Sequence, residues 1–268
     1  MIKKLRARTK LRRRLAGLLA LAVALVSVGA LYSVLVPQPQ TAQAQDVADP
    51  ATVRAGKQLF DNTCITCHGA NLEGVKGRGP SLVGIGEAAI YFQTSTGRMP
   101  AVVQGAQAEK KPPVLTPEEI DQLIAYTNDA GGAGVNMPAA QGEELRGGNP
   151  ARGGELFRLN CASCHNFTGR GGALSSGKSA PALDGVDEAT IYAAMLTGPQ
   201  NMPRFSERQL SPTEKKDIIT YVKSVTDGNN NPGGNPIGGL GPQSEGFIAF
   251  LIGMVALVGV TLWIGSKA

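Results

Sequence analysis

The stretch that decides the fold is Cys64-Ile65-Thr66-Cys67-His68, and the chain repeats it as Cys161-Ala162-Ser163-Cys164-His165. Both stretches have the pattern C-x-x-C-H. Together they contain all four cysteines and both histidines of the 268 residues. Two side chains three positions apart lie on the same face of a helical turn. The chain therefore has two equivalent sites, each built from two thiols and an adjoining imidazole.

The spacing C-x-x-C-H is the attachment signature of c-type haem. The two thiols reach the vinyl groups of one porphyrin and form thioethers, and the histidine is the proximal ligand of the iron. We therefore predict two covalently bound haem c groups. One is held by Cys64, Cys67 and His68, and the other by Cys161, Cys164 and His165. Aromatic residues are only 5% of the chain, so each porphyrin would supply apolar core that the side chains do not.

Two haem-free interpretations of the cysteine pairs remain as alternatives, a zinc site and a disulfide. A zinc site would need further Cys or His ligands in each unit, and the sequence has none. A disulfide would not require a histidine after each pair. A haem-free module would give fewer than two c-type haems per chain in a pyridine haemochrome assay.

Each motif lies in a longer unit that the chain contains twice. A helix is predicted before each motif, opening at Asp49-Pro50 and at Asn149-Pro150, with proline at the first helical position. A closing helix is predicted after Thr116 and after Ser211, where a Ser or Thr, a Pro and a Glu form a capping box. Shorter helices are predicted around 88–94 and 188–196. No strand pattern is found, so the units are predicted to be all-α.

Two apolar runs without charges flank the repeated units, at residues 15–36 and 247–265. Each run is long enough to cross the roughly 30 Å hydrocarbon core as a helix. The positive-inside rule places the basic arm, residues 1–14, in the cytoplasm. We therefore expect a multi-pass protein of the plasma membrane whose haem units lie outside the cytoplasm.

The first apolar run has a second interpretation, as a cleavable signal sequence ending near Ala42-Gln43-Ala44. Its apolar stretch exceeds the usual ~7–15 residues of a signal core, which favours a retained anchor. N-terminal sequencing of the mature protein distinguishes the two.

The predicted organisation of the chain follows from these segments. It comprises a basic arm (1–14), a transmembrane helix (15–36), a first unit (46–130), a flexible joint (131–148), a second unit (149–228), a linker (229–246) and a transmembrane helix (247–265). The joint and the linker are rich in glycine, and the linker also in asparagine and proline, as linkers are.

The net charge of +5 does not indicate a nucleic-acid partner. Eight of the 26 Lys and Arg residues lie in the arm 1–14, where no aromatic residue alternates with them. A stacking platform for bases needs such aromatics. The remainder of the chain is slightly acidic, so no nucleic acid is expected to bind.

Methionines are the candidates for the sixth iron ligands, because no third histidine exists. Met99-Pro100 and Met202-Pro203 lie in matching loops before the two closing helices. A thioether ligand raises the reduction potential and suits electron transfer. The alternative is that these methionines fill gaps in the core. Met137-Pro138 has no counterpart in the other unit, and Met195 lies in a predicted helix, so neither is expected to bind iron.

Two prolines follow the motifs at similar distances, Pro80 and Pro181. The carbonyl of each could accept the N–H of the proximal histidine and so orient the ring.

These features together resemble a class I cytochrome c domain, present twice. With its flanking membrane segments, the chain is similar to the dihaem cytochrome c subunits of actinobacterial-type cytochrome bcc complexes, the menaquinol:cytochrome c reductases. The resemblance implies that one haem accepts an electron from the Rieske iron–sulfur subunit. The other would deliver it to the copper centre of cytochrome c oxidase. It also implies a cytochrome b subunit as partner, and no catalytic residue in this chain alone.

A second functional class fits the same motifs. The chain could be the cytochrome subunit of a membrane dehydrogenase or a free-standing membrane electron shuttle. Dehydrogenase cytochromes of this kind often carry a third haem motif, which this chain lacks.

Overall fold

The computed structural model describes residues 16–30, 48–102, 105–132, 134–227 and 242–267. The chain divides into two compact units, Met1–Val47 and Ala48–Ala268. The described part of the first is an apolar helix, Ala16–Ala30. The basic arm, the ends of the predicted span 15–36, the possible cleavage site and most of the linker 229–246 lie outside the described residues.

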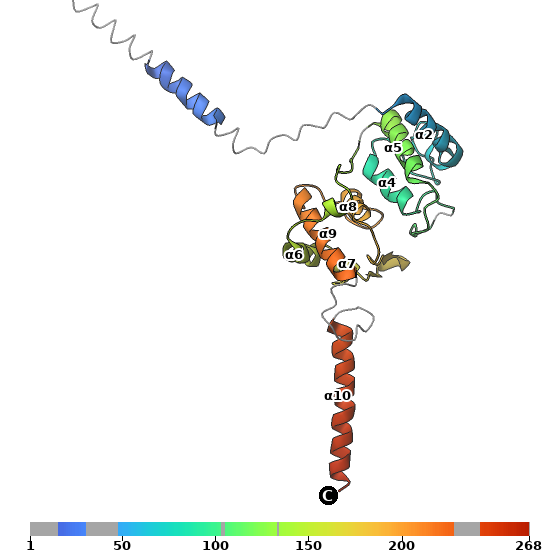
Figure 1. Ribbon diagram of the computed structural model, residues 1–268, viewed down its shortest axis with the longest axis vertical. Helices are drawn as coiled ribbons and strands as arrows, with labels where there is room; N and C mark the ends of the chain where they lie inside the picture. Colours follow the sequence, from blue (N-terminus) through green and yellow to red (C-terminus); the bar gives the residue numbers. More distant parts are fainter. Residues whose placement is uncertain (1–15, 31–47, 103–104, 133, 228–241, 268) are drawn as a thin grey trace, which may run out of the picture. The chain divides into compact units, whose positions relative to one another are not determined.

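The first C-x-x-C-H motif lies in a bundle of short helices (Figure 1). These helices are α2 (Pro50–Thr63), α3 (Ile65–His68), α4 (Glu87–Ser95) and α5 (Pro117–Gly131). Asp49 caps α2, and Thr116 with Glu119 forms the predicted capping box of α5. Where α2 packs on α5, the rings of Phe60 and Tyr126 lie 5.3 Å apart between centroids.

The second motif lies in a bundle of the same design. Its elements are η1 (Gly142–Leu145), α6 (Pro150–Asn160), α7 (Ala162–His165), α8 (Glu188–Thr197) and α9 (Pro212–Thr226). Asn149 caps α6, and Ser211 with Glu214 forms the capping box of α9. The rings of Phe157 and Tyr221 again lie 5.3 Å apart, between α6 and α9. The repeat in the sequence is thus a repeat in three dimensions.

A glycine stands where the first and last helices of each bundle cross. A Cβ added to Gly56 would overlap the carbonyl oxygen of Gln122, and one added to Gly153 would overlap that of Asp217. Helices approach this closely only where one of them lacks a side chain. The absence of a Cβ therefore sets the distance between α2 and α5 and between α6 and α9.

The described residues are mainly helical, as predicted, but a short hairpin adds strands where none were expected. β1 (Gly172–Ala173) pairs antiparallel with β2 (Ser179–Ala180), in the register Gly172↔Ala180 and Ala173↔Ser179. Ser176 and Gly177, with φ of 60° and 70°, reverse the chain between the strands. The prediction that strands are absent was wrong here, because two-residue strands are too short to show alternation.

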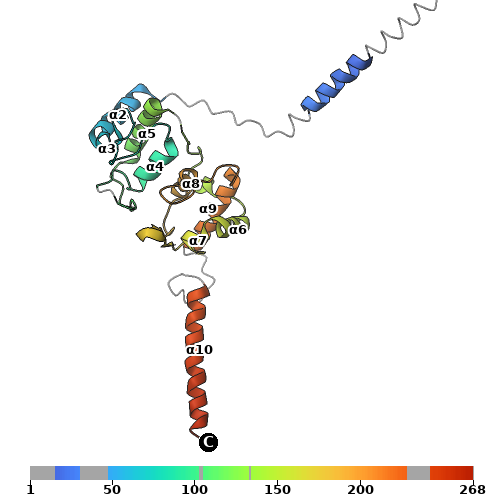
Figure 2. The same cartoon turned by 180° about the vertical axis from the view of Figure 1, so that it is seen from behind.

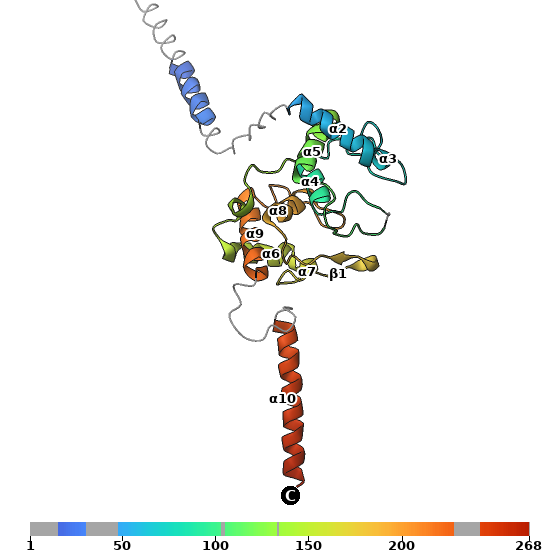
Figure 3. The same cartoon turned by 45° about the vertical axis from the view of Figure 1, so that its right-hand side comes forward.

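The C-terminal run forms α10 (Pro242–Gly265), seen as the long red helix in Figure 3. Its segment Ser244–Gly265 is apolar, long enough to cross a membrane, and not buried against the rest of the protein. A helix that exposes apolar side chains on every face suits a lipid environment rather than water.

Helix α4 of the first bundle packs against α8 of the second. The segment that connects the bundles packs against both of them. On one side, Val135 O accepts from Ala88 N at 2.9 Å, and Met137 N donates to Glu87 Oε2 at 3.2 Å. On the other side, Leu145 is fully buried in the core of the second bundle. Figure 2 shows the same bundles from behind.

Candidate haem sites

The backbone of the two C-x-x-C-H motifs is nearly identical. Cys64 N donates to Phe60 O at 2.8 Å, and His68 N donates to Cys64 O at 3.0 Å. The corresponding bonds of Cys161 and His165 are 2.8 and 2.9 Å. Each motif is therefore one helical turn that presents both sulfurs and the imidazole together.

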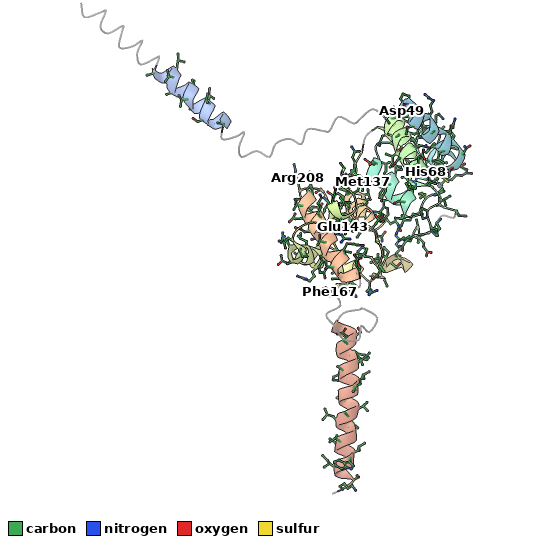
Figure 4. All side chains as sticks on the ribbon, viewed as in Figure 1. Asp49, His68, Met137, Glu143, Phe167 and Arg208 are labelled. Carbon is green, nitrogen blue, oxygen red and sulfur yellow. The ribbon has the colours of Figure 1, made fainter. Side chains whose placement is uncertain are left out.

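A proline carbonyl fixes each imidazole. The distance from His68 Nδ1 to Pro80 O is 2.8 Å, and from His165 Nδ1 to Pro181 O it is 3.0 Å. A carbonyl oxygen only accepts, so Nδ1 is the donor, and in the neutral ring Nε2 is then the nitrogen with a lone pair for a metal. The predicted contact of the proline carbonyls is confirmed. His68, labelled in Figure 4, is the more deeply buried of the two.

Burial sets the protonation of these side chains. It lowers the pKa of His165 although Pro181 accepts its proton, so the ring is neutral, as an iron ligand must be. Burial, with a smaller contribution from the neighbouring cysteine, raises the pKa of the Cys64 thiol to about 11 and that of Cys161 to about 12. Thiols of this kind are not the low-pKa, reactive thiols of redox disulfide enzymes.

The second motif opens into a large apolar cleft. Cys161, Cys164, His165 and Met202 all line it. The cleft is open to solvent, and its empty space, the open mouth included, is about 1250 Å³. Apolar walls, two sulfurs, a neutral imidazole and a thioether are the groups that a covalently attached haem requires, so the residues fit one.

The two methionines predicted as sixth ligands lie in equivalent loops, Met99 after α4 and Met202 after α8. Met99 N donates to Gln93 O at 2.9 Å, and Met202 N donates to Pro199 O at 3.0 Å. Met202 shares its cleft with Met195, which is 2% exposed in the core of the bundle. Met137, labelled in Figure 4, lies on the connecting segment.

Comparison with known proteins gives the family. Residues 53–130 match the family model "Cytochrome c", and residues 148–222 match "Cytochrome C oxidase, cbb3-type, subunit III". Over 267 residues the chain is 55% identical to the cytochrome bc1 complex cytochrome c subunit of Mycobacterium tuberculosis, covering 98% of this chain and 95% of that protein. The chain belongs to the family of cytochrome bc1 complex cytochrome c subunits.

A second relative agrees with this assignment, and a more distant one is a subunit of a different complex. The corresponding subunit of Corynebacterium diphtheriae is 52% identical over 279 residues, with 99% of both chains covered. The cbb3-type cytochrome c oxidase subunit CcoP of Azospirillum sp. is more distant, at 29% over 198 residues, or 65% of this chain. Cytochrome c domains carry covalently attached haem c, and one C-x-x-C-H motif lies within each matched region.

Neither haem-free alternative has further support in this cytochrome c subunit. No group of three or more His, Cys, Asp or Glu side chains that could hold a metal ion occurs among the described residues. The four cysteines form no disulfide with one another.

The cleft of the second cytochrome domain also contains residues of the first domain, which the sequence did not indicate. Gln107 pairs with the backbone of Ser179 in both directions, accepting from its N–H at 2.8 Å and donating to its carbonyl at 2.7 Å. Gln200 Nε2 donates to Ala108 O at 2.9 Å. The lining residues from the first domain are Phe92, Thr96, Arg98, Gln107 and Lys110.

The charged side chains that line the cleft within the described part of the chain are all cationic. They are Arg98, Lys110 and Lys178, and no described Asp or Glu lines it. Arg98 is 7% exposed, and burial lowers the pKa of its guanidinium. Lys110, by contrast, is exposed. The sequence signal for Arg98 was weak, because a single arginine beside a predicted methionine ligand has no motif of its own.

Proposed function

We propose that this chain is the electron carrier of a quinol-oxidising cytochrome bcc complex, taking electrons from the Rieske iron–sulfur subunit and passing them towards cytochrome c oxidase. The observation that carries the proposal is the pair of equivalent C-x-x-C-H turns, each with its histidine bonded to a proline carbonyl. Near full-length similarity to cytochrome c subunits of bc1 complexes supports it.

Each bundle would attach one haem c, whose iron alternates between the ferric and ferrous states. Cys64 and Cys67 would form thioethers in the first, and Cys161 and Cys164 in the second. His68 and His165 would be the proximal ligands, each oriented by its proline. Met99 and Met202 would be the sixth ligands, which keep the potential high and keep oxygen away from the iron.

Placing both sites on one chain makes the transfer between them intramolecular. Its rate then depends on the contact between the domains and not on diffusion. With His68 and Met99 holding one iron and His165 and Met202 holding the other, this chain would have no site for substrate. Quinol oxidation would occur on the cytochrome b subunit of the assembled reductase.

The membrane topology follows from the two apolar runs. Helix α10 would anchor the second domain, and residues 15–36 would form a second anchor if they are retained. The basic arm 1–14 would remain in the cytoplasm. Both cytochrome domains would then face the Rieske subunit and the oxidase outside the cytoplasm.

Affinity purification of the tagged full-length chain in mild detergent tests the assignment. We expect co-purification of a cytochrome b, a Rieske protein and oxidase subunits, and reduction of both haems on addition of menaquinol. Recovery with a periplasmic dehydrogenase, and without cytochrome b or oxidase, would instead support the dehydrogenase alternative.

The number of haems is tested separately. A pyridine haemochrome assay on the purified chain should give two c-type haems. A count of one or none would contradict the two-haem proposal whatever partners are recovered.

A further inference from the structure

Arg98, on the loop after α4, is a buried cation without a partner of opposite charge. It is 7% exposed, and its Nε is buried without a hydrogen-bond partner. The guanidinium carbon lies 4.9 Å from the centre of the Phe92 ring. No ion pair of Arg98 with an acidic side chain occurs among the described residues.

Such an arrangement is costly unless a ligand offsets it. Arginine stays protonated in proteins, and a buried charge without a partner destabilises the fold. Stacking on an aromatic ring offsets only part of this cost. The planar guanidinium matches a carboxylate, to which it donates two parallel hydrogen bonds.

The surroundings of Arg98 indicate where that carboxylate comes from. Arg98 lines the cleft of the second domain, together with Cys161, Cys164 and His165. Among the residues that the structure describes, the charged side chains in the lining are all cations, so the described part of the chain supplies no carboxylate there. A haem attached to these cysteines would carry two propionate carboxylates, which are the acidic groups that such a cofactor would add to this cleft.

We propose that Arg98 of the first domain binds a propionate of the haem held by the second domain. The inference rests on the two-haem function proposed above. It makes the first domain part of the binding site of the second haem. The loop 97–100 would then contact both haems, because Met99 is the predicted iron ligand of the first haem and Arg98 would bind the second.

Redox titration of the purified full-length complex carrying Arg98→Gln tests the proposal. A cation beside a haem stabilises the ferrous state, which has one positive charge less than the ferric state. We therefore expect a lower midpoint potential for the haem of the second domain. A Met202→His variant, which lowers the potential of that haem through its own ligand, identifies which transition belongs to it.

Two control variants separate a specific contact from a general charge effect. Arg54→Gln removes the same charge from an exposed position on α2 and should leave both potentials unchanged. Arg98→Lys keeps the charge but loses the paired donors, so its potential should lie between those of Arg98→Gln and the wild type.

Three outcomes would overturn the inference. They are an unchanged second potential in Arg98→Gln, an equal shift in Arg54→Gln, and a shift confined to the first haem, which would show that Arg98 acts only through Met99. The number of haems measured by the haemochrome assay distinguishes a failure of this proposal from a failure of the proposed function. Two haems with an unchanged potential reject the Arg98 contact alone, whereas a wild-type count below two rejects the two-haem proposal itself.

Discussion

At the scale of single residues, one hydrogen bond to a proline carbonyl orients each histidine ring. The carbonyls of Pro80 and Pro181 accept from Nδ1 of His68 and His165. In the neutral ring, each bond places the proton on Nδ1, leaves Nε2 as the nitrogen available to a metal, and orients the ring. Proline suits this position because its ring restricts the backbone, and this restriction holds the direction of the carbonyl that accepts the bond.

Replacement of Met202 by leucine tests the sixth ligand. Leucine has no lone pair, so we expect the potential of one haem to fall by on the order of 0.1 V, within the ~0.8 V range that axial ligands control. Covalent attachment should be intact, because the thioethers form elsewhere. Redox titration and the haemochrome assay measure the two effects.

Two other methionines provide the controls for this experiment. Met137→Leu changes the same Met-Pro dipeptide outside the cleft and should leave both potentials unchanged. Met195→Leu changes the other methionine of the cleft. A fall in Met195→Leu with none in Met202→Leu would move the ligand assignment to Met195.

At the scale of the helices, the crossing of α6 with α9 depends on Gly153. Alanine there would overlap the carbonyl of Asp217, and backbone atoms cannot rotate away. We expect Gly153→Ala to destabilise the second domain by about 1–3 kcal/mol or more. The midpoint of urea denaturation, followed by haem absorption, measures this change.

The adjacent glycine is the matched control. A Cβ on Gly154 would lie 3.0 Å from Cδ2 of the Tyr221 ring, a side chain that can shift. Gly154→Ala should therefore cost less than Gly153→Ala. Equal losses for the two variants would show that helix packing does not depend on the crossing glycine.

The capping box of α9 gives the second domain a dependence on pH. Glu214 accepts from Ser211 N at 3.0 Å and pairs with Arg152 at 3.0 Å. The Ser211 N–H, then Arg152, lowers the pKa of Glu214 below its ordinary 4.5. A carboxylate with a lowered pKa stabilises the fold fully above about pH 4.5 and loses this contribution as the pH falls through its folded-state pKa.

Glu214→Gln should therefore lower the denaturation midpoint at pH 7. The difference from the wild type should shrink as the pH falls below 4.5. Glu144→Gln, an exposed glutamate of the same domain, should show no such convergence. A Glu214→Gln difference that is constant with pH would contradict the assigned role.

At the scale of the whole molecule, both cytochrome domains contribute residues to the walls of one cleft, the candidate haem site of the second domain. Gln107 and Gln200 bond across from one domain to the other, and α4 packs on α8. The contact between domains therefore contributes both to the distance between the haems and to the walls of one haem site.

The double variant Gln107→Ala, Gln200→Ala should loosen this contact. We expect faster hydrogen exchange in residues 172–180, because the Ser179 N–H loses its acceptor, while the core of α9 stays protected. Gln141→Ala, which changes an exposed side chain on the connecting segment, is the control. Unchanged exchange at 172–180 would show that the two glutamines do not hold the domains together.

Much of this protein could be predicted from the sequence because the deciding contacts are local. The C-x-x-C-H turns, the capped helices at Asp49, Thr116 and Ser211, and the proline that meets each histidine involve residues close together in the chain. Their spacing specifies helical turns and hydrogen bonds whatever surrounds them. The apolar run that became α10 is also a local property, of length and composition.

Only the tertiary structure decided which residues complete the cleft of the second domain. Arg98 lies in the first repeat, and its place in the lining of the cleft that also contains Cys161 and His165 depends on how α4 packs against α8. The same holds for Gln107 on Ser179 and for the β1–β2 hairpin, which no periodicity reveals. Spacing within one repeat carries no information on contacts between repeats, because the packing of two folded surfaces determines those contacts.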